Sequence, residues 1–383
     1  MRTIIAVLVC IVQLTMYSNG LAATIRINGL VVDSLSGVPL PFAHVLAENV
    51  GVTTNADGVF SINVSDEILP PKLTVKYIGY ESYRVEVEDV DKDLVLRMKP
   101  SVDVLEEVFV LTADRVISNV NAYRQINYEY NDMLLTAFYK ESVSANEQMA
   151  YLAEGVFDIY LPTVYSSNQV ELEVKKTRKK TFIDLDSIHM LYVTGHASDM
   201  INGSMRRDHS FLDLDEMKNY TYWKEGISFY DGEEVYIIGF KPARKKGMAA
   251  GTLYITTESN ALIRAEYYPV ISHQHFWTHV KWVEEYVQLN STWLLKQVLY
   301  EGSWRAQENQ YAFEAILDIS TFSALEAKPA MTNTISENAI FFDSADELEE
   351  DFWSQHNYVG LSKKELAAIK EAKKITSASA KMP

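Results

Sequence analysis

Three histidines stand at a spacing that suits a metal site. His273, His275 and His279 lie in the segment HQHFWTH, at positions of the same parity. Successive side chains of a strand point to opposite faces of the sheet, so on one strand all three would face the same way. Imidazole nitrogens at positions i and i+2 can bind zinc or copper. One hypothesis is therefore a metal-binding module built on this strand.

An ordinary strand with one solvated face explains the same spacing. Phe276, Val280 and Trp282 have the opposite parity and would then point into the core. A carboxylate close to the histidines would strengthen the metal hypothesis, but Glu284 lies too far along the chain and has the other parity. The sequence favours the ordinary strand, and metal binding stays an alternative.

Other catalytic patterns are missing from the sequence. A zinc carboxypeptidase needs a H-x-x-E pair and a distant histidine, and the chain contains no H-x-x-E. The single cysteine is Cys10, so the chain beyond it has neither disulfides nor thiol chemistry. No Ser-His-Asp order, glycine-rich phosphate loop or paired-carboxylate motif rises above chance. We expect a protein that is not an enzyme and needs no cofactor; a hydrolase with an unrecognised site is the alternative.

The charge balance argues against nucleic acid as a partner. The chain has 52 acidic and 35 basic residues and a formal net charge of -17, so its surface repels phosphate backbones. Two basic runs, Lys175 to Lys180 and Arg244 to Lys246, could contact anionic lipid headgroups. Nothing amphipathic flanks either run, which favours solvated loops instead.

Residues 1–23 have the order of an export signal. A short positive start precedes an almost purely apolar run from Ile4 to Val12, and small residues follow. This run is too short to span a membrane, and no later segment is apolar for long enough. Val9 precedes Cys10 where a lipoprotein signal needs a small residue. We therefore expect export to the periplasm or to the outer membrane, with no transmembrane segment in the mature chain.

Residues 24–100 alternate between apolar and polar positions in short runs. Turn signals separate these runs about every ten residues, which indicates an all-β sandwich of the seven-stranded type. Gly37 and Pro39 mark one turn. Asp57-Gly58 predicts a tight hairpin between the strands beside it, because glycine tolerates the positive φ of such turns.

The same stretch carries a family resemblance. INGLVVDSLSGVPLPFAHV, TTNADGVFSI and LTVKYIGYES resemble the carboxypeptidase-regulatory-like domain, a transthyretin-like sandwich common in exported proteins of Gram-negative bacteria. The turn residues of the family map onto Gly37, Pro39, Asp57, Gly58, Gly79 and Tyr80. The resemblance implies that these residues shape the fold and do no chemistry.

Residues 101–114 form a linker, which resembles the segment after this sandwich in TonB-dependent receptors. The chain is too short for the membrane barrel of those transporters, and we reject that interpretation. Val116, Val120 and Tyr123 follow at helical spacing and predict an amphipathic helix.

Residues 115–327 predict a larger, mostly antiparallel curved sheet with a few helices. Long strand-like stretches alternate with turns such as Asp231-Gly232 and Glu258 to Ala261. The segment from Tyr236 to Tyr267 resembles lipoprotein-carrier-like half-barrels. That resemblance implies a concave face that could hold an apolar ligand. The many aromatic residues allow a glycan ligand as well, although most would be core.

Residues 328–383 predict a helical tail. Ser344 with Glu347 and Ser362 with Glu365 are capping boxes, each expected to begin a helix. The aromatic pair Phe352 and Trp353 is expected to dock the tail onto the sheet.

The sequence thus predicts a mainly β, non-catalytic envelope protein. We expect a binding or assembly module whose sandwich makes protein contacts and whose curved sheet holds a ligand or partner. The partner would be an envelope protein or an outer-membrane component, and the ligand apolar or a glycan.

Overall fold

The structure is a computed structural model of the whole chain. It describes residues 24–67, 69–101, 111–128, 131–163, 169–182, 197–206, 210–270, 277–289, 291–306, 308–336, 339, 341–346 and 356–379. The predicted export signal therefore lies outside the described residues. The predicted fold class is confirmed: the chain is mainly β, with a small sandwich followed by a large curved antiparallel sheet.

The sandwich has two layers. Its strands are β1 (Thr24–Asp33), β2 (His44–Ala47), β3 (Val50–Thr53), β4 (Val59–Ser65), β5 (Lys72–Lys76), β6 (Tyr83–Glu86) and β7 (Leu94–Met98). One layer has the order β4-β1-β7, and the other has the order β3-β2-β5-β6. Apolar side chains of both layers, including Ile27, Val45, Phe60 and Leu73, are buried between them. This core matches the alternation seen in the sequence.

The turn at Asp57-Gly58 does not form the predicted hairpin. β3 pairs with β2 and β17, whereas β4 pairs with β1, so the turn carries the chain from one layer to the other. The side-chain oxygen of Asn55 accepts the backbone N–H groups of Asp57 at 2.9 Å and Val59 at 3.0 Å. The Asp-Gly signal therefore located a tight turn with positive φ, but it could not specify the strand partner.

Gly58 and Gly37 provide a matched test of this turn. Both have positive φ, +74° and +72°. A Cβ at Gly58 would lie 2.8 Å from the Val31 carbonyl oxygen and 2.9 Å from Pro39 Cβ, whereas Gly37 has no neighbour within 4 Å. We expect Gly37→Val to cost about 1–2 kcal/mol of unfolding free energy from backbone strain alone, and Gly58→Val to cost clearly more. Chemical denaturation of both variants measures this, and equal losses would contradict the close packing at Gly58.

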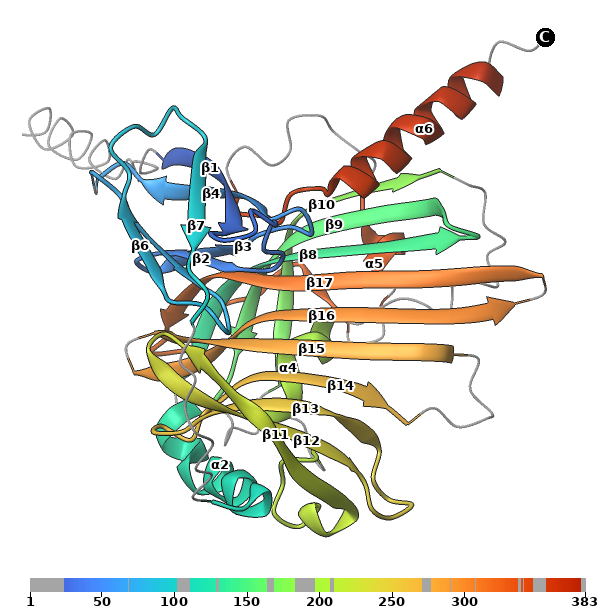
Figure 1. Cartoon of the computed structure of the whole chain (residues 1–383). Helices are drawn as coiled ribbons and strands as arrows, with labels where there is room; N and C mark the ends of the chain where they lie inside the picture. The colour runs from blue at the N-terminus through green and yellow to red at the C-terminus, as the bar shows by residue number, and fades with distance from the viewer. Residues whose placement is uncertain are drawn as a thin grey trace, which may run out of the picture.

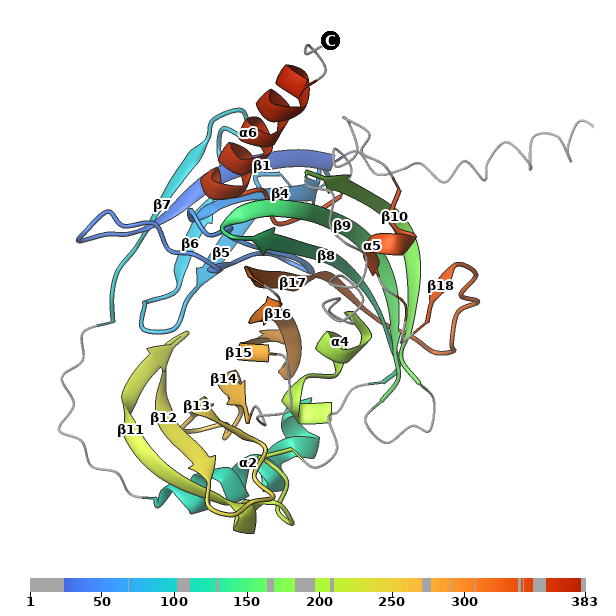
Figure 2. The same cartoon turned by 90° about the vertical axis from the view of Figure 1, so that its right-hand side faces the viewer.

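The large sheet is a long antiparallel meander with one crossover. Its strands are β8 (Met133–Ala145), β9 (Gln148–Leu161), β10 (Glu171–Thr181), β11 (Tyr220–Tyr230), β12 (Glu233–Pro242), β13 (Ala249–Thr256), β14 (Leu262–Pro269), β15 (Trp277–Leu289), β16 (Thr292–Ala306), β17 (Asn309–Ala324) and β18 (Thr334–Ile335). β11 to β17 pair in sequence order, and β17 then pairs with β8, followed by β9, β10 and β18. The sheet curls into a half-barrel, as Figure 2 shows. The predicted turns at Asp231-Gly232 and Glu258 to Ala261 join β11 to β12 and β13 to β14.

The sandwich is attached to the outer side of the half-barrel (Figure 1). β17 is irregular between Ile319 and Thr321, and there Thr321 pairs with Val50 of β3. The sandwich layer β3-β2-β5-β6 thereby joins the hydrogen-bonded network of the large sheet. This connection places the sandwich against the strands that form the middle of the half-barrel.

The described helices lie along the large sheet and in the C-terminal tail. They are α2 (Ala113–Tyr128), α4 (Ala197–Arg206), the 3₁₀ helix η1 (Met217–Asn219), α5 (Phe341–Ser344) and α6 (Lys363–Ser379). The predicted helix after the linker is confirmed as α2, which buries Val116 and Val120. Tyr123 was wrongly predicted for this buried face, since it is 42% exposed. α4 lies within the hollow of the half-barrel (Figure 2).

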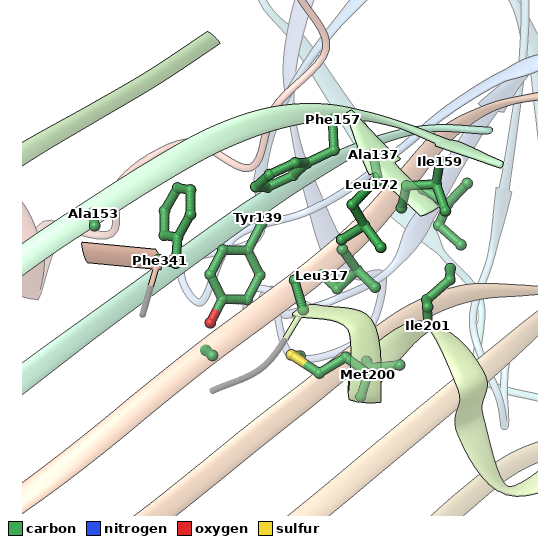
Figure 3. Close-up of a cluster of buried hydrophobic side chains, with 14 of the residues drawn as sticks. Ala137, Tyr139, Ala153, Phe157, Ile159, Leu172, Met200, Ile201, Leu317 and Phe341 are labelled. Carbon is green, nitrogen blue, oxygen red and sulfur yellow. The ribbon is translucent and has the colours of Figure 1, made fainter. Parts of the chain in front are cut away.

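The inner core joins the sheet to α4 and α5 (Figure 3). The ring centroid of Phe341 from α5 lies 5.1 Å from that of Tyr139 and 5.5 Å from that of Phe157. Gly155 leaves the space for this ring, because a Cβ there would lie 2.8 Å from Phe341. The tail is therefore bound to the inner side of the sheet through α5.

The two predicted capping boxes have different outcomes. Ser362 and Glu365 form one at the start of α6, where Glu365 N–H donates to Ser362 Oγ at 3.2 Å and Ser362 N–H to Glu365 Oε2 at 2.6 Å. Ser344 ends α5 instead of beginning a helix. Its partner Glu347, and the aromatic pair Phe352 and Trp353, lie outside the described residues.

Candidate ligand cavity

A mostly apolar cavity lies between the inner side of the half-barrel and two helices. Its enclosed volume is about 30 Å³, and the wider depression around it, solvent-open space included, is about 510 Å³. Its lining comes from α2, α4 and strands β8, β9, β15, β16 and β17: Arg124, Tyr128, Leu135, Leu161, Ile201, Asn202, Met205, Arg206, Tyr286, Trp293, Leu294, Leu295, Ile319 and Phe322. The mostly apolar lining is typical of ligand pockets, whereas the enclosed volume is far below the roughly 300–1,000 Å³ of most of them. The concave face expected from the sequence is therefore largely covered, and the cavity is the space left under the cover.

A buried carboxylate fixes α4 over the sheet. Glu284 of β15 is fully buried, and its Oε2 accepts hydrogen bonds from the backbone N–H and the hydroxyl of Ser204, both at 2.7 Å. Tyr267 donates to its other oxygen at 2.6 Å. Gly203 has a φ of +51°, which breaks the helix and directs the Ser204 amide to the carboxylate. Because a buried carboxyl group needs such partners, these contacts hold one wall of the cavity in place.

Two arginines line the cavity beside the apolar groups. Arg124 of α2 pairs with Asp213 at 3.1 Å and donates to the carbonyl oxygen of Met205. Arg206 of α4 donates to the carbonyl oxygen of Pro162 at 2.8 Å. These contacts connect α2, α4 and the end of β9, so the guanidinium groups are held in position at the cavity wall.

On the opposite side of β15, Glu285 binds the sandwich. His44 of β2 contacts its Oε2 at 2.9 Å, and Arg264 and Gln297 also donate to it. Burial alone would raise the pKa of Glu285, but the Arg264 charge and the His44 hydrogen bond outweigh it and lower the pKa to about 2. Glu285 therefore stays ionised and cross-links the two sheets.

A second buried charge pair strengthens this contact. Lys296 of β16 and Asp318 of β17 are both almost fully buried and form an ion pair, and the Thr53 hydroxyl of β3 donates to Asp318 at 2.6 Å. Burial lowers the pKa of Lys296, although Asp318 opposes this shift. A further ion pair between the sandwich and the large sheet joins Lys76 of β5 to Asp231 at 2.7 Å. The sandwich is thus held by charges at several points.

The predicted histidine site is not assembled by the described residues. His279 lies exposed on β15, and its ring is 5.7 Å from that of Tyr268. The pairing of β15 with β16 is irregular between Trp277 and His279, so the simple alternation assumed from the sequence fails there. His273 and His275 lie outside the described residues, and within the described part no three His, Cys, Asp or Glu side chains are grouped to hold a metal ion.

One basic run was wrongly predicted as a solvated loop. Lys175 to Lys180 lies inside β10, beside the acidic side chains of β9. Lys175 pairs with Asp158 at 3.1 Å, and Arg178 pairs with the buried Glu154 at 2.5 Å. The acidic partners of these basic side chains lie on the neighbouring strand β9, so the basic run read by itself in the sequence does not reveal them. Arg244 to Lys246 does lie in an exposed loop, between β12 and β13.

The turn residues of the sandwich lie away from the cavity. Gly79 has a φ of +84°, and Pro39 bridges to Val32 of β1. Asp57 accepts the backbone N–H of Lys363 at 2.5 Å, which joins this turn to the start of α6. Tyr80 donates to Asp33 at 3.0 Å, and burial together with that bond raises its pKa to about 12.

Sequence reasoning missed the residues that matter most for the cavity. α4, Arg124 and Arg206 were not singled out. A usable signal was present in α2, where Arg124 follows Val116, Val120 and Ile117 on the apolar side of the helix. A charged residue on the face of a helix that turns toward the core indicates a buried partner or a site.

Comparison with known proteins supports the sandwich directly. Residues 27–110 match the CarboxypepD_reg-like domain family. The resemblance seen in the sequence is therefore confirmed for this part of the chain. Among proteins with curated descriptions, none matches the chain significantly.

Solved structures resemble part of the chain with low identity. A DUF1329 family protein from Desulfovibrio piger is 11% identical, with a TM-score of 0.29, and the match covers 57% of this chain and 95% of that one. A LolA superfamily protein from Nitrosomonas europaea is 12% identical, with a TM-score of 0.27 and coverage of 57% and 96%. The MucA/MucB complex of Pseudomonas aeruginosa is 8% identical, with a TM-score of 0.18, and the match covers 56% of this chain and 100% of that one.

The described helices include none that is both long enough and apolar enough to cross a membrane.

Proposed function

We propose that this protein is a non-catalytic binding protein of the bacterial envelope that carries an apolar or amphiphilic ligand in the half-barrel cavity. One observation supports this most directly: the inner side of the sheet keeps an apolar, partly open cavity under α2 and α4. The apolar lining suits such a ligand, and because the enclosed volume is only about 30 Å³, the ligand would also occupy the solvent-open part of the depression.

In this proposal the parts of the chain have separate roles. Residues 1–23 direct export to the periplasm or the outer membrane and are removed. Residues 24–100 make contacts with an envelope protein, residues 101–114 link them to the carrier, and residues 115–327 hold the ligand. Residues 328–383 brace the inner side of the sheet, as the burial of Phe341 supports.

A cavity-filling substitution tests the carrier role. Leu295 is half-buried and lines the cavity. We expect Leu295→Trp to abolish most ligand binding, because the larger ring occupies the space of an acyl chain. Purified protein is extracted with organic solvent, and the lipid content per protein molecule is measured by mass spectrometry. The parent should contain lipid close to stoichiometry, and the variant several-fold less.

Leu299→Trp is the matched control. Leu299 lies four residues further along β16, is also half-buried, and packs on Phe138, Val156 and Ile316 at the other side of the sheet. It should lose stability without losing lipid. A parent protein free of lipid, in extracts and after incubation with lipid, would contradict the proposed function; so would equal losses in both variants.

A further inference from the structure

The lining of the cavity has an unusual charge. Arg124 and Arg206 both belong to it, and the described residues of the lining include no aspartate or glutamate. The chain as a whole has a formal net charge of -17, so two arginines in one mostly apolar wall stand out from its composition. Asp213 pairs with Arg124 at 3.1 Å but is not part of the lining. A positive group beside an apolar surface suits a ligand with one anionic end.

The arginines are positioned for contact with a ligand. Arg124 uses its two terminal nitrogens for these contacts, one for Asp213 and one for the carbonyl oxygen of Met205. A guanidinium group has five N–H donors in a planar fork, so donors of Arg124 are left for a second acceptor. Arg206 is anchored through the Pro162 carbonyl oxygen on the facing element. Anchored side chains lose little conformational entropy when a ligand binds.

A buried donor in the same wall points to an acceptor. Trp293 is 3% exposed, and its Nε1 has no hydrogen-bond partner among the described residues. The indole N–H is a donor only, and a buried donor without a partner is costly. Trp293 lines the cavity together with the arginines. An oxygen atom of a ligand would accept a hydrogen bond from this N–H, and Arg124 and Arg206 would supply positive charge beside it.

We infer that the ligand is an anionic amphiphile: an acyl or alkyl chain lies against the apolar wall, and a carboxylate or phosphate end is bound near Arg124 and Arg206. This inference rests on the proposed carrier function and specifies its ligand class. The apolar part of the wall includes Leu135 of β8 and Ile319 and Phe322 of the neighbouring strand β17.

Three probes that differ only in their headgroup test the inference. Hexadecanoate, hexadecyl phosphate and uncharged hexadecan-1-ol are titrated into the full chain, and the tryptophan fluorescence is followed. We expect one or both anions to bind about tenfold more tightly than the alcohol, the difference that a charge-assisted hydrogen bond supplies. The preference between the two anions then separates a carboxylate ligand from a phosphate ligand.

The variants Arg206→Gln, Arg206→Lys and Arg305→Gln identify the headgroup site. Arg305 is an exposed arginine of β16 and serves as the control. Arg206→Gln should reduce the affinity for the anions to that for the alcohol and leave the alcohol unchanged, whereas the other two variants should keep the preference. Thermal melting of each variant establishes that it is folded, and the three-probe comparison on the parent chain stands without any variant.

Two results would overturn the inference in distinguishable ways. If the alcohol binds as tightly as both anions, and Leu295→Trp still abolishes its binding, the headgroup inference is wrong and the carrier function stands. If none of the three probes binds, both are wrong.

Discussion

Asp318→Ala should destabilise the whole chain by about 3–5 kcal/mol, because it leaves the Lys296 ammonium buried without its counter-ion. Lys296 is fully buried, and Asp318 is 1% exposed. The remaining contact of the ammonium, to the carbonyl oxygen of Ile319 at 2.8 Å, cannot neutralise the charge. The same change removes the acceptor of the Thr53 hydroxyl, so the sandwich should lose part of its attachment. Urea denaturation gives the loss directly.

The double variant Lys296→Met/Asp318→Leu is the control for this result. It removes both charges and keeps the volume, and buried ion pairs replaced in this way often leave stability unchanged or raised. The double variant should therefore be much more stable than Asp318→Ala. If the two variants were equally unstable, packing at these positions would matter and the buried charge would not.

Glu141→Gln should stabilise the protein relative to the parent, and this difference should grow as the pH rises from about 5 to 8. Glu141 of β8 is fully buried, accepts the Tyr139 hydroxyl at 2.7 Å and lies within 3.4 Å of the Tyr151 hydroxyl. Burial raises its pKa from 4.5 to about 8, and the tyrosine hydrogen bonds only partly oppose this shift. In this pH range the folded chain keeps a proton that the unfolded chain releases, so the contribution of Glu141 to stability falls as the pH rises.

The size of this effect is a few kcal/mol at pH 8, since each pKa unit corresponds to about 1.4 kcal/mol. Glutamine is neutral at every pH and removes the dependence. Melting temperatures of the parent, Glu141→Gln and Glu301→Gln are compared from pH 4.5 to 8.5. Glu301 is exposed on β16, so its variant should follow the parent. A difference between Glu141→Gln and the parent that does not change with pH would contradict the raised pKa.

Glu141 also connects the sheet to the tail. The ring of Phe342 in α5 lies 4.3 Å from that of Tyr151, and Phe341 packs on Tyr139. Ionisation of Glu141 places a charge beneath α5. We expect the first loosening at alkaline pH to occur at this contact, since α5 has only four residues.

Much of the fold could be predicted from local patterns. The alternation of apolar and polar residues predicted the sandwich and the curved sheet, because successive side chains of a strand point to opposite faces and burial therefore repeats every second residue. α2 and the capping box of Ser362 and Glu365 were also predicted, because their interactions lie within one or two helical turns. The matched residues 27–110 support the same sandwich.

The sequence by itself therefore determined the fold class, the order of most strands and several turns, while the tertiary structure decided the strand partners, the position of α4 and the site. β3 and β4 follow one another but join different layers. His44 and Glu285 are 241 positions apart, and Arg124 reaches the cavity beside Arg206 from a separate helix. Local repeats record which side chains are buried, whereas the partner of a buried charge depends on how distant segments pack. The cavity exists only because α2 and α4 cover the sheet incompletely, and no single segment encodes that gap.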